Sequence, residues 1–285
     1  MYKIIKHVDF LVRGHGMNVL TIYDDQLLLN TARAKDLFRC LAQFNIRIEC
    51  PNGLSVAFMD EELISLMHTA GVDTVNLAIE SGSPYVLKKI MYKPLRLESV
   101  KPIVEMLRKY NFWVHAFFVI GMPGETDEHR KETVKFIKGI GFDWCGFSMA
   151  TPLRGTNLFD ICIQNGYIKN DIGIGEIGAG GYIINTPEYS AQYIIDQVYK
   201  INLDVNFVNN YRMSIGDYKI AIDSFKNVLK ICPDHAFAHY YLACMMFGLG
   251  LKYIEEALYH RNAFNRIIEE KKMWKELYNE LRTIE

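Results

Sequence analysis

The stretch that decides the fold class is residues 112–126, which read FWVHAFFVIGMPGET. Residues 112–120 form a long apolar run, and the next six residues hold two glycines, a proline and Thr126, a residue type that caps helices. A strand that is apolar at successive positions is typical of a parallel sheet covered on both faces. The stretch therefore predicts a buried parallel strand, a turn and then a helix.

The same order of strand, turn and helix recurs from residue 17 to about 165. Each predicted strand precedes a helical run, including a helix that Asp60 can cap and Gly71 can end, and helix-length crossovers indicate parallel strands. Polar and glycine-rich residues cluster after the strands, where barrel sites are built. We predict an α/β fold, a partial (β/α) TIM-like barrel with a C-terminal helical region. The strands are expected at 17–23, 46–50, 74–79, 112–120 and 142–149.

The predicted boundaries divide the chain into a partial barrel at 1–170, a glycine-rich linker at 171–187 and a helical region at 188–285. The linker contains G-x-G-x-x-G at Gly173, Gly175 and Gly178. That pattern binds dinucleotides only where it opens a helix after a strand in a βαβ unit, and here it does not. We therefore interpret it as a loop.

The helical region resembles a tetratricopeptide repeat over about residues 211–250. Gly216, Ala221, Phe225 and Pro233 match the small, bulky and terminating positions of one repeat, and the pattern degrades in the next. Such repeats need about three units for independent stability. The region therefore either packs on the barrel or carries a short peptide-binding groove.

Composition excludes several classes of function. The formal net charge of −1 gives no basic field for nucleic acid. No stretch approaches the roughly 18 apolar residues of a membrane span, and charges come too early for a signal peptide. We expect a cytoplasmic protein that binds neither nucleic acid nor membrane. The cysteines are scattered without metal-ligand spacing, which predicts reduced, mostly buried thiols: Cys40, Cys50, Cys145, Cys162, Cys232 and Cys244.

Four elements at the ends of predicted strands together resemble the radical S-adenosylmethionine (SAM) superfamily, specifically its cobalamin-binding-domain type. One is an aspartate pair, and the others resemble the family's G-I-E-S-G-S, I-G-x-P-G-E-T and T-P-x-x-G-T elements. They follow the family's order over residues 1 to about 165. The four are YDD at 23–25, AIESGS at 78–83, VIGMPGET at 119–126 and TPLRGT at 151–156.

The resemblance implies a SAM site at these strand ends. An aspartate can hold the α-amino group of SAM, and a glutamate and a serine can bond its ribose hydroxyls. Glycines let the backbone approach the adenine, with an isoleucine as a stacking surface. The expected site residues are Asp24, Asp25, Glu80, Ser81, Ile120, Gly121, Gly124 and Glu125.

Structural alternatives stay open for each element. The aspartate pair can simply cap the following helix, and Ser81 or Ser83 can cap the helix that contains Val86. Pro123-Gly124 can be only a tight turn before Thr126. His115, on an apolar strand, is more typical of a hydrogen-bonded core histidine than of a catalytic one.

In this family a C-x-x-x-C-x-x-C motif after the first barrel strand holds the [4Fe–4S] cluster. The sequence has no such motif, so we predict no metal ligands in this chain. Residues 1–16 resemble the helix after that loop. We expect a partner chain to carry the first strand, the cluster loop and a cobalamin domain. The predicted function is the SAM-binding part of a radical SAM enzyme, inactive without that segment; the alternative is a non-catalytic barrel remnant that holds a partner through its helical tail.

Overall fold

The structure is a computed structural model that describes residues 1–169 and 181–282. It divides into two compact units, Met1–Ile194 and Ile195–Glu285. Most of the predicted glycine-rich linker, with Gly173, Gly175 and Gly178, lies outside the described residues. Residues 181–187 of that linker form neither helix nor strand.

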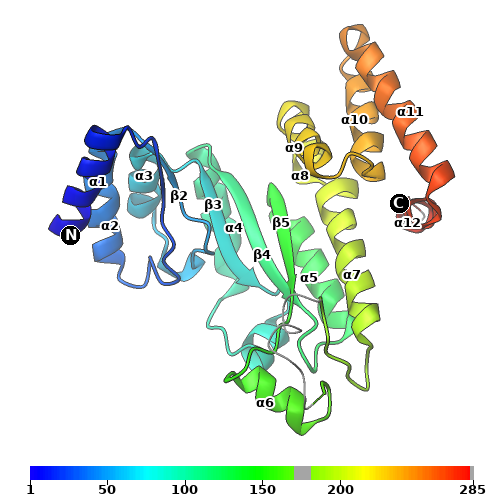
Figure 1. Cartoon of the computed structure of the whole chain (residues 1–285), viewed down its shortest axis with the longest axis horizontal. Helices are drawn as coiled ribbons and strands as arrows, with labels where there is room; N and C mark the ends of the chain where they lie inside the picture. The colour runs from blue at the N-terminus through cyan, green and yellow to red at the C-terminus, as the bar shows by residue number, and fades with distance from the viewer. Residues whose placement is uncertain (170–180, 283–285) are drawn as a thin grey trace. The chain divides into compact units, whose positions relative to one another are not determined.

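The first unit alternates helices and strands, as the sequence predicts (Figure 1). Short 3-10 turns interrupt the alternation at Ala42–Phe44, Val56–Phe58 and Leu97–Ser99. The main elements are α1 (Tyr2–His15), β1 (Val19–Thr21), α2 (Thr31–Leu41), β2 (Arg47–Glu49), α3 (Glu61–Ala70), β3 (Thr74–Glu80), α4 (Val100–Lys109), β4 (Trp113–Ile120), α5 (Asp127–Ile140), β5 (Trp144–Met149) and α6 (Asn157–Gln164).

All the strand pairs within the sheets are parallel. Strands β1 and β2 form one sheet, and β3, β4 and β5 lie side by side in a second one (Figure 1). Isolated bridges from Ile48 to Val72 and from Leu54 to Leu77 connect the two sheets. The prediction of a partial parallel α/β barrel is confirmed, and the strands of the described ranges do not close into a full barrel.

Strand β4 shows how the open sheet differs from the sequence prediction. Val114, Ala116, Phe118 and Ile120 are completely buried on one face. The alternating side chains are only half-buried, and they belong to Trp113, His115, Phe117 and Val119. The second face is therefore covered less completely than the sequence predicted, because the open set of strands leaves it without opposing strands.

The helix ends follow local signals that were predictable. Asp60 caps α3 by accepting a hydrogen bond from Leu63 N at 2.8 Å, and Gly71 ends that helix with a φ of 99°. Thr126 caps α5 in a capping box with His129. The predicted helix around Val86 is instead a π-helical turn at Val86–Ile90.

The second unit is helical, and α7 enters it from the first. Ala221 and Phe225, at the small and bulky repeat positions, are completely buried, and Phe207 stacks on Phe225 with centroids 5.1 Å apart. The tetratricopeptide resemblance stays a prediction. The elements are α7 (Ala191–Leu203), a π-helical turn (Asp204–Val208), α8 (Tyr211–Ser214), α9 (Tyr218–Ile231), α10 (Ala236–Gly248), a 3-10 turn (Leu251–Tyr253), α11 (Ile254–Glu270) and α12 (Lys272–Arg282). None of the helices in the described ranges is long and apolar enough to span a membrane.

Candidate functional site

Three of the four motif elements end neighbouring strands of one sheet. Glu80 at the end of β3 is in register with Phe118 of β4, and Ile120 of β4 is in register with Met149 of β5. The elements at 78–83, 119–126 and 151–156 therefore meet at the carboxyl edge of this sheet. This is the edge where parallel α/β folds build ligand sites.

Glu80 lies in an unusual backbone conformation at that edge. Its φ is 71°, in the left-handed region, and the register of β3 shifts between Ala78 and Glu80. Its carboxylate accepts a hydrogen bond from Lys93 Nζ at 3.0 Å, and both side chains are about a quarter exposed. A non-glycine residue in this region is strained, and such strain clusters at functional sites. Sequence reasoning identified Glu80 but missed Lys93.

Ser81 lies behind the strand end and not at its open edge. The side chain is completely buried, and its hydroxyl is 3.2 Å from that of Thr133 on α5. Thr133 Oγ1 also accepts from Gly82 N at 3.1 Å. Ser83 Oγ has no hydrogen-bond partner among the described residues, so Ser83 does not cap the helical turn that follows. Ser81 Oγ accepts a hydrogen bond from Ser83 N at 3.1 Å, just before that turn. Ser81 fixes the β3 end against α5.

The aspartate pair follows β1 in the two-stranded sheet. Asp24 accepts from Gln26 N at 2.9 Å, and Asp25 accepts from the Asn52 amide at 2.5 Å. Helix α2 is capped by Asn30, which accepts from the backbone N–H of Arg33. The capping alternative for the aspartates is therefore wrong, and both carboxylates lie at the carboxyl end of β1.

The residues after β4 form a tight turn. Glu125 N donates to Met122 O at 2.9 Å across Pro123 and Gly124, and Gly124 has a φ of 86°. Proline followed by a residue with positive φ is the signature of a type II turn. The tight-turn interpretation is confirmed, and it is compatible with ligand binding at the same backbone.

Two of the expected site residues in this element are inaccessible. Ile120 and Glu125 are 0% exposed, so Ile120 offers no stacking surface and that expectation is corrected. The Ile120 side chain lies on the completely buried face of β4. Glu125 accepts from Gly121 N at 2.6 Å and faces Arg130 at 3.4 Å. Burial raises the pKa of Glu125 to about 7 against the opposing effects of the Gly121 N–H and Arg130.

A segment far along the chain holds the same turn from the other side. We call residues 182–193 the tyrosine strap. The hydroxyls of Tyr182 and Tyr189 both donate to the carbonyl oxygen of Gly121, the latter at 3.1 Å. A Cβ on Gly121 would lie 2.8 Å from Ile194 and 2.9 Å from Tyr182. The close approach at Gly121 is thus made by the protein itself, which sequence reasoning did not predict.

The strap is also anchored beyond the turn. Tyr193 OH donates to Asp127 at 2.7 Å, and Arg130 bonds Asp127 at 2.5 Å. The Arg130 guanidinium lies 5.5 Å from the centre of the Tyr189 ring. These contacts lock the first turn of α5 to the strap.

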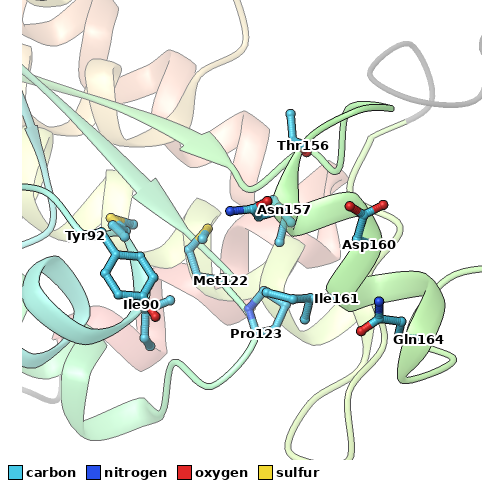
Figure 2. A pocket seen from close by; sticks show the side chains of 11 residues that line it. Ile90, Tyr92, Met122, Pro123, Thr156, Asn157, Asp160, Ile161 and Gln164 are labelled. Carbon is cyan, nitrogen blue, oxygen red and sulfur yellow. The ribbon is translucent and has the colours of Figure 1, made fainter.

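A pocket of about 670 Å³ opens beside the strand ends (Figure 2). It lies between the segment after the π-helical turn, the tight turn and α6. Its volume is in the range of pockets that bind small molecules. The lining residues are Ile90, Met91, Tyr92, Met122, Pro123, Thr156, Asn157, Leu158, Asp160, Ile161 and Gln164.

His115 lies on the half-buried face of β4, with its ring centre 4.7 Å from that of Phe117. Burial lowers its pKa to about 4, so the imidazole is neutral at physiological pH. Among the described residues its Nε2 atom has no hydrogen-bond partner. His115 is therefore partly buried, as expected of a core histidine, but its Nε2 atom lacks the hydrogen bond that was expected with it.

The cysteines do not fit a [4Fe–4S] cluster. Burial raises the pKa of Cys50 to about 12 and that of Cys162 to about 11, whereas a cluster needs thiolates. None of the six cysteines, all of which lie in the described ranges, forms a disulfide, and Cys232 and Cys244 are exposed in the second unit. Within the described ranges no group of three potential metal ligands comes together.

Comparison with known proteins connects this geometry to a family. The model of the radical SAM superfamily matches residues 3–137. Cytidylyl-2-hydroxyethylphosphonate methyltransferase from Streptomyces wedmorensis is 32% identical over 67% of this chain and 37% of its own length. An uncharacterized methyltransferase of Pyrococcus horikoshii is 30% identical over 57% of this chain and 35% of its own length.

A solved structure shares the fold. The radical SAM methyltransferase TsrM of Kitasatospora setae, with cobalamin and a [4Fe–4S] cluster bound, superposes with a TM-score of 0.51 at 20% identity. The match covers 60% of this chain and 35% of that one. The chain thus spans little more than a third of the length of these two curated relatives. Through the domain at residues 3–137, the chain belongs to the radical SAM superfamily.

Proposed function

We propose that this chain is the SAM-binding part of a radical SAM enzyme of the methyltransferase type. Family membership and the names of the relatives support the reaction class. The observation that carries the proposal is the placement of Glu80 and the Gly121 turn at neighbouring strand ends. Glu80 offers a half-buried carboxylate, and Gly124 is the exposed residue of the neighbouring turn, an arrangement suited to a ribose next to a purine.

The residues of this chain divide into two roles in the proposal. Glu80 accepts hydrogen bonds from the ribose hydroxyls, and Asp24 or Asp25 holds the α-amino group. Ser81 and Glu125, both buried, hold the β3 end and the tight turn in place from behind. Lys93 keeps the Glu80 carboxylate oriented before the ligand arrives.

Reductive cleavage of SAM is the chemistry that a [4Fe–4S] cluster supplies when bound, and the described residues do not provide its ligands. We propose that the cluster loop, the first strand and a cobalamin domain belong to a partner segment. Strand β1 pairs only with β2 in the described ranges, which leaves one edge for such a strand. Phe10 on α1 is 58% exposed and offers apolar surface to the same segment.

The first test is calorimetric titration of the full chain with SAM under anaerobic conditions. The variant Glu80→Gln keeps the shape of the side chain and removes its charge. We expect its affinity for SAM to fall about tenfold or more, as for a lost hydrogen bond to a charged group. Glu98→Gln, on the exposed surface, is the matched control and should bind as the wild type does. Equal affinity in the two variants would contradict the assignment of Glu80.

The partner segment has a separate test. After reconstitution with iron and sulfide, the chain alone should retain no cluster and form no 5′-deoxyadenosine. Cluster retention by the isolated chain would show that its own cysteines assemble a site, and the partner proposal would then fail. The SAM titration would be unaffected by that result.

A further inference from the structure

The pocket beside the strand ends is separate from the residues assigned to SAM. None of the eight expected SAM residues lines it, although Met122 and Pro123 lie between Gly121 and Gly124 in the same turn. The pocket therefore borders the proposed SAM site without including its side chains. A second ligand bound there would lie next to SAM.

One wall of the pocket is a polar row on α6. Asn157, Asp160 and Gln164 are spaced three and four residues apart, so they follow one face of the helix, with Ile161 between them. In the part of the chain that the structure describes, these three polar side chains have no hydrogen-bond partner, and they are exposed. Two carboxamides and a carboxylate are thus available to a ligand.

The facing wall is apolar and contains one aromatic ring. Figure 2 shows Ile90, Tyr92, Met122 and Pro123 across from the α6 side chains. Tyr92 is 82% exposed and has a φ of 52°, so a bulky side chain is kept at a strained backbone position. Methionine adapts its shape to a ligand, and a tyrosine ring offers a flat face.

The charge of the pocket discriminates among ligands. Asp160 is its one ionisable carboxylate, and none of the described lining residues is a lysine, arginine or histidine. The nearby Lys93 is engaged by Glu80, and the Arg154 guanidinium lies 5.6 Å from the centre of the Phe159 ring. An anionic ligand would meet an uncompensated negative charge here.

We propose that this pocket is the substrate site, and that it takes a ligand with a flat apolar body and a neutral or cationic polar end. The flat body packs between Tyr92 and Met122, and the polar end faces Asp160 and the carboxamides of Asn157 and Gln164. Phosphates, phosphonates and carboxylates are excluded from the polar end. This inference rests on the proposed function only in treating the bound molecule as a substrate.

Three probes with the same ring system and different charges test the proposal: 2-naphthylmethylamine, 2-naphthylmethanol and 2-naphthoate. Their dissociation constants are measured on the full chain by ligand-observed NMR at low ionic strength. We expect the amine to bind about tenfold more tightly than the carboxylate, with the alcohol between them. This is the size of effect expected when the polar end of the ligand makes one partly solvated charge contact with Asp160. Preferred binding of the carboxylate, or no saturable binding of any probe, would overturn the proposal.

Two variants assign the effect to residues. Asp160→Asn should reduce the difference between amine and carboxylate to less than about twofold, because it removes the charge and keeps the shape. Asp223→Asn, exposed on α9, is the matched control and should keep the full preference. Tyr92→Ala should weaken all three probes about fivefold without changing their order. An unchanged charge preference in Asp160→Asn would refute the role of the polar row.

Competition with SAM separates this inference from the proposed function. If SAM displaces the amine in a simple competitive manner, the pocket belongs to SAM and the substrate assignment fails. If the chain binds the probes as expected but does not bind SAM, the proposed function fails and the pocket assignment stands. Simultaneous binding of SAM and the amine is the expected result.

Discussion

The hydroxyl of Tyr182 donates a hydrogen bond to the carbonyl of Gly121, a residue 61 positions earlier in the chain. Tyr189 donates to the same oxygen, and both tyrosines are buried. Gly121 directly precedes the tight turn at residues 122–125, which the proposed function places beside SAM. The tyrosine strap is therefore part of the support of that turn, although it follows the strands of the barrel.

Removal of the two strap hydroxyls should destabilise the first unit. Tyr182→Phe with Tyr189→Phe leaves the buried Gly121 carbonyl without these donors, which costs about 1–3 kcal/mol. Urea unfolding measures the change. Tyr193→Phe is the control, because the Tyr193 hydroxyl bonds the exposed Asp127 and its loss should cost less than about 1 kcal/mol. Equal losses in the two proteins would contradict a special role for the Gly121 contact.

Gly121→Ala should be among the more damaging small substitutions in the chain. The added methyl group would contact Tyr182 and Ile194 at less than 3 Å, and the φ of 87° is itself unfavourable for alanine. We expect a loss of at least about 2 kcal/mol in the free energy of unfolding. Gly166 also has a positive φ, of 69°, but a Cβ added there would have no atom within 4 Å. Gly166→Ala therefore measures the backbone effect alone and should cost about 1 kcal/mol.

Thr133→Val tests the support behind Glu80. The valine keeps the shape of Thr133 but removes the oxygen that accepts from Gly82 N and contacts the Ser81 hydroxyl. Two buried polar groups then lack this partner, so we expect a loss of about 1–3 kcal/mol in thermal or urea unfolding. Thr69→Val, whose hydroxyl donates to Ser65 O on the exposed face of α3, should cost less than about 0.5 kcal/mol. A neutral result for Thr133→Val would refute the role of this contact.

The helical unit should lose stability in mild acid. Burial lowers the pKa of His235 to about 4, and the imidazole accepts from Ala238 N as the cap of α10. Because the folded pKa is below the unfolded value, the stabilisation is complete above about pH 6.5 and is lost as the pH falls toward 4. For this one group we expect a loss of about 2 kcal/mol between pH 7 and pH 5.

Unfolding of the full chain at the two pH values measures this loss. His235→Asn keeps a good capping side chain and removes the titration, so the difference between pH 7 and pH 5 should shrink. His7→Asn, exposed on α1, should leave it unchanged. His239 and His260, whose Nδ1 atoms are 2.8 Å apart, also have pKa values lowered by burial and add to the same trend. A pH-independent stability of the wild type would contradict the prediction.

Local features of the sequence predicted local structure well. Asp60 and Thr126 cap the helices that they precede, and Pro123-Gly124 forms the expected turn. Each depends on hydrogen bonds within a few residues, so the sequence contains the necessary information. The parallel sheet was predictable for a different reason: parallel neighbours need helix-length crossovers, and these are visible in the spacing of the elements.

The burial of individual side chains was not predictable in the same way. Ser81 and Ile120 belong to motif elements at a strand end, but alternation along β4 directs Ile120 to the buried side and packing against Thr133 of α5 buries Ser81. Lys93 reaches Glu80 from 13 residues away, across the π-helical turn. Contacts of this kind depend on register and on the path of the chain, which motif spacing does not specify.

The strap has a consequence for synthesis on the ribosome. The hydroxyls that hold Gly121 are translated 61 and 68 residues after it. At about 5–20 residues per second, the turn would wait about 3–14 seconds after its own synthesis before these donors exist. During that interval the Gly121 carbonyl is open to water and has no cover, so the β3–β4–β5 sheet can form before its ligand edge is complete.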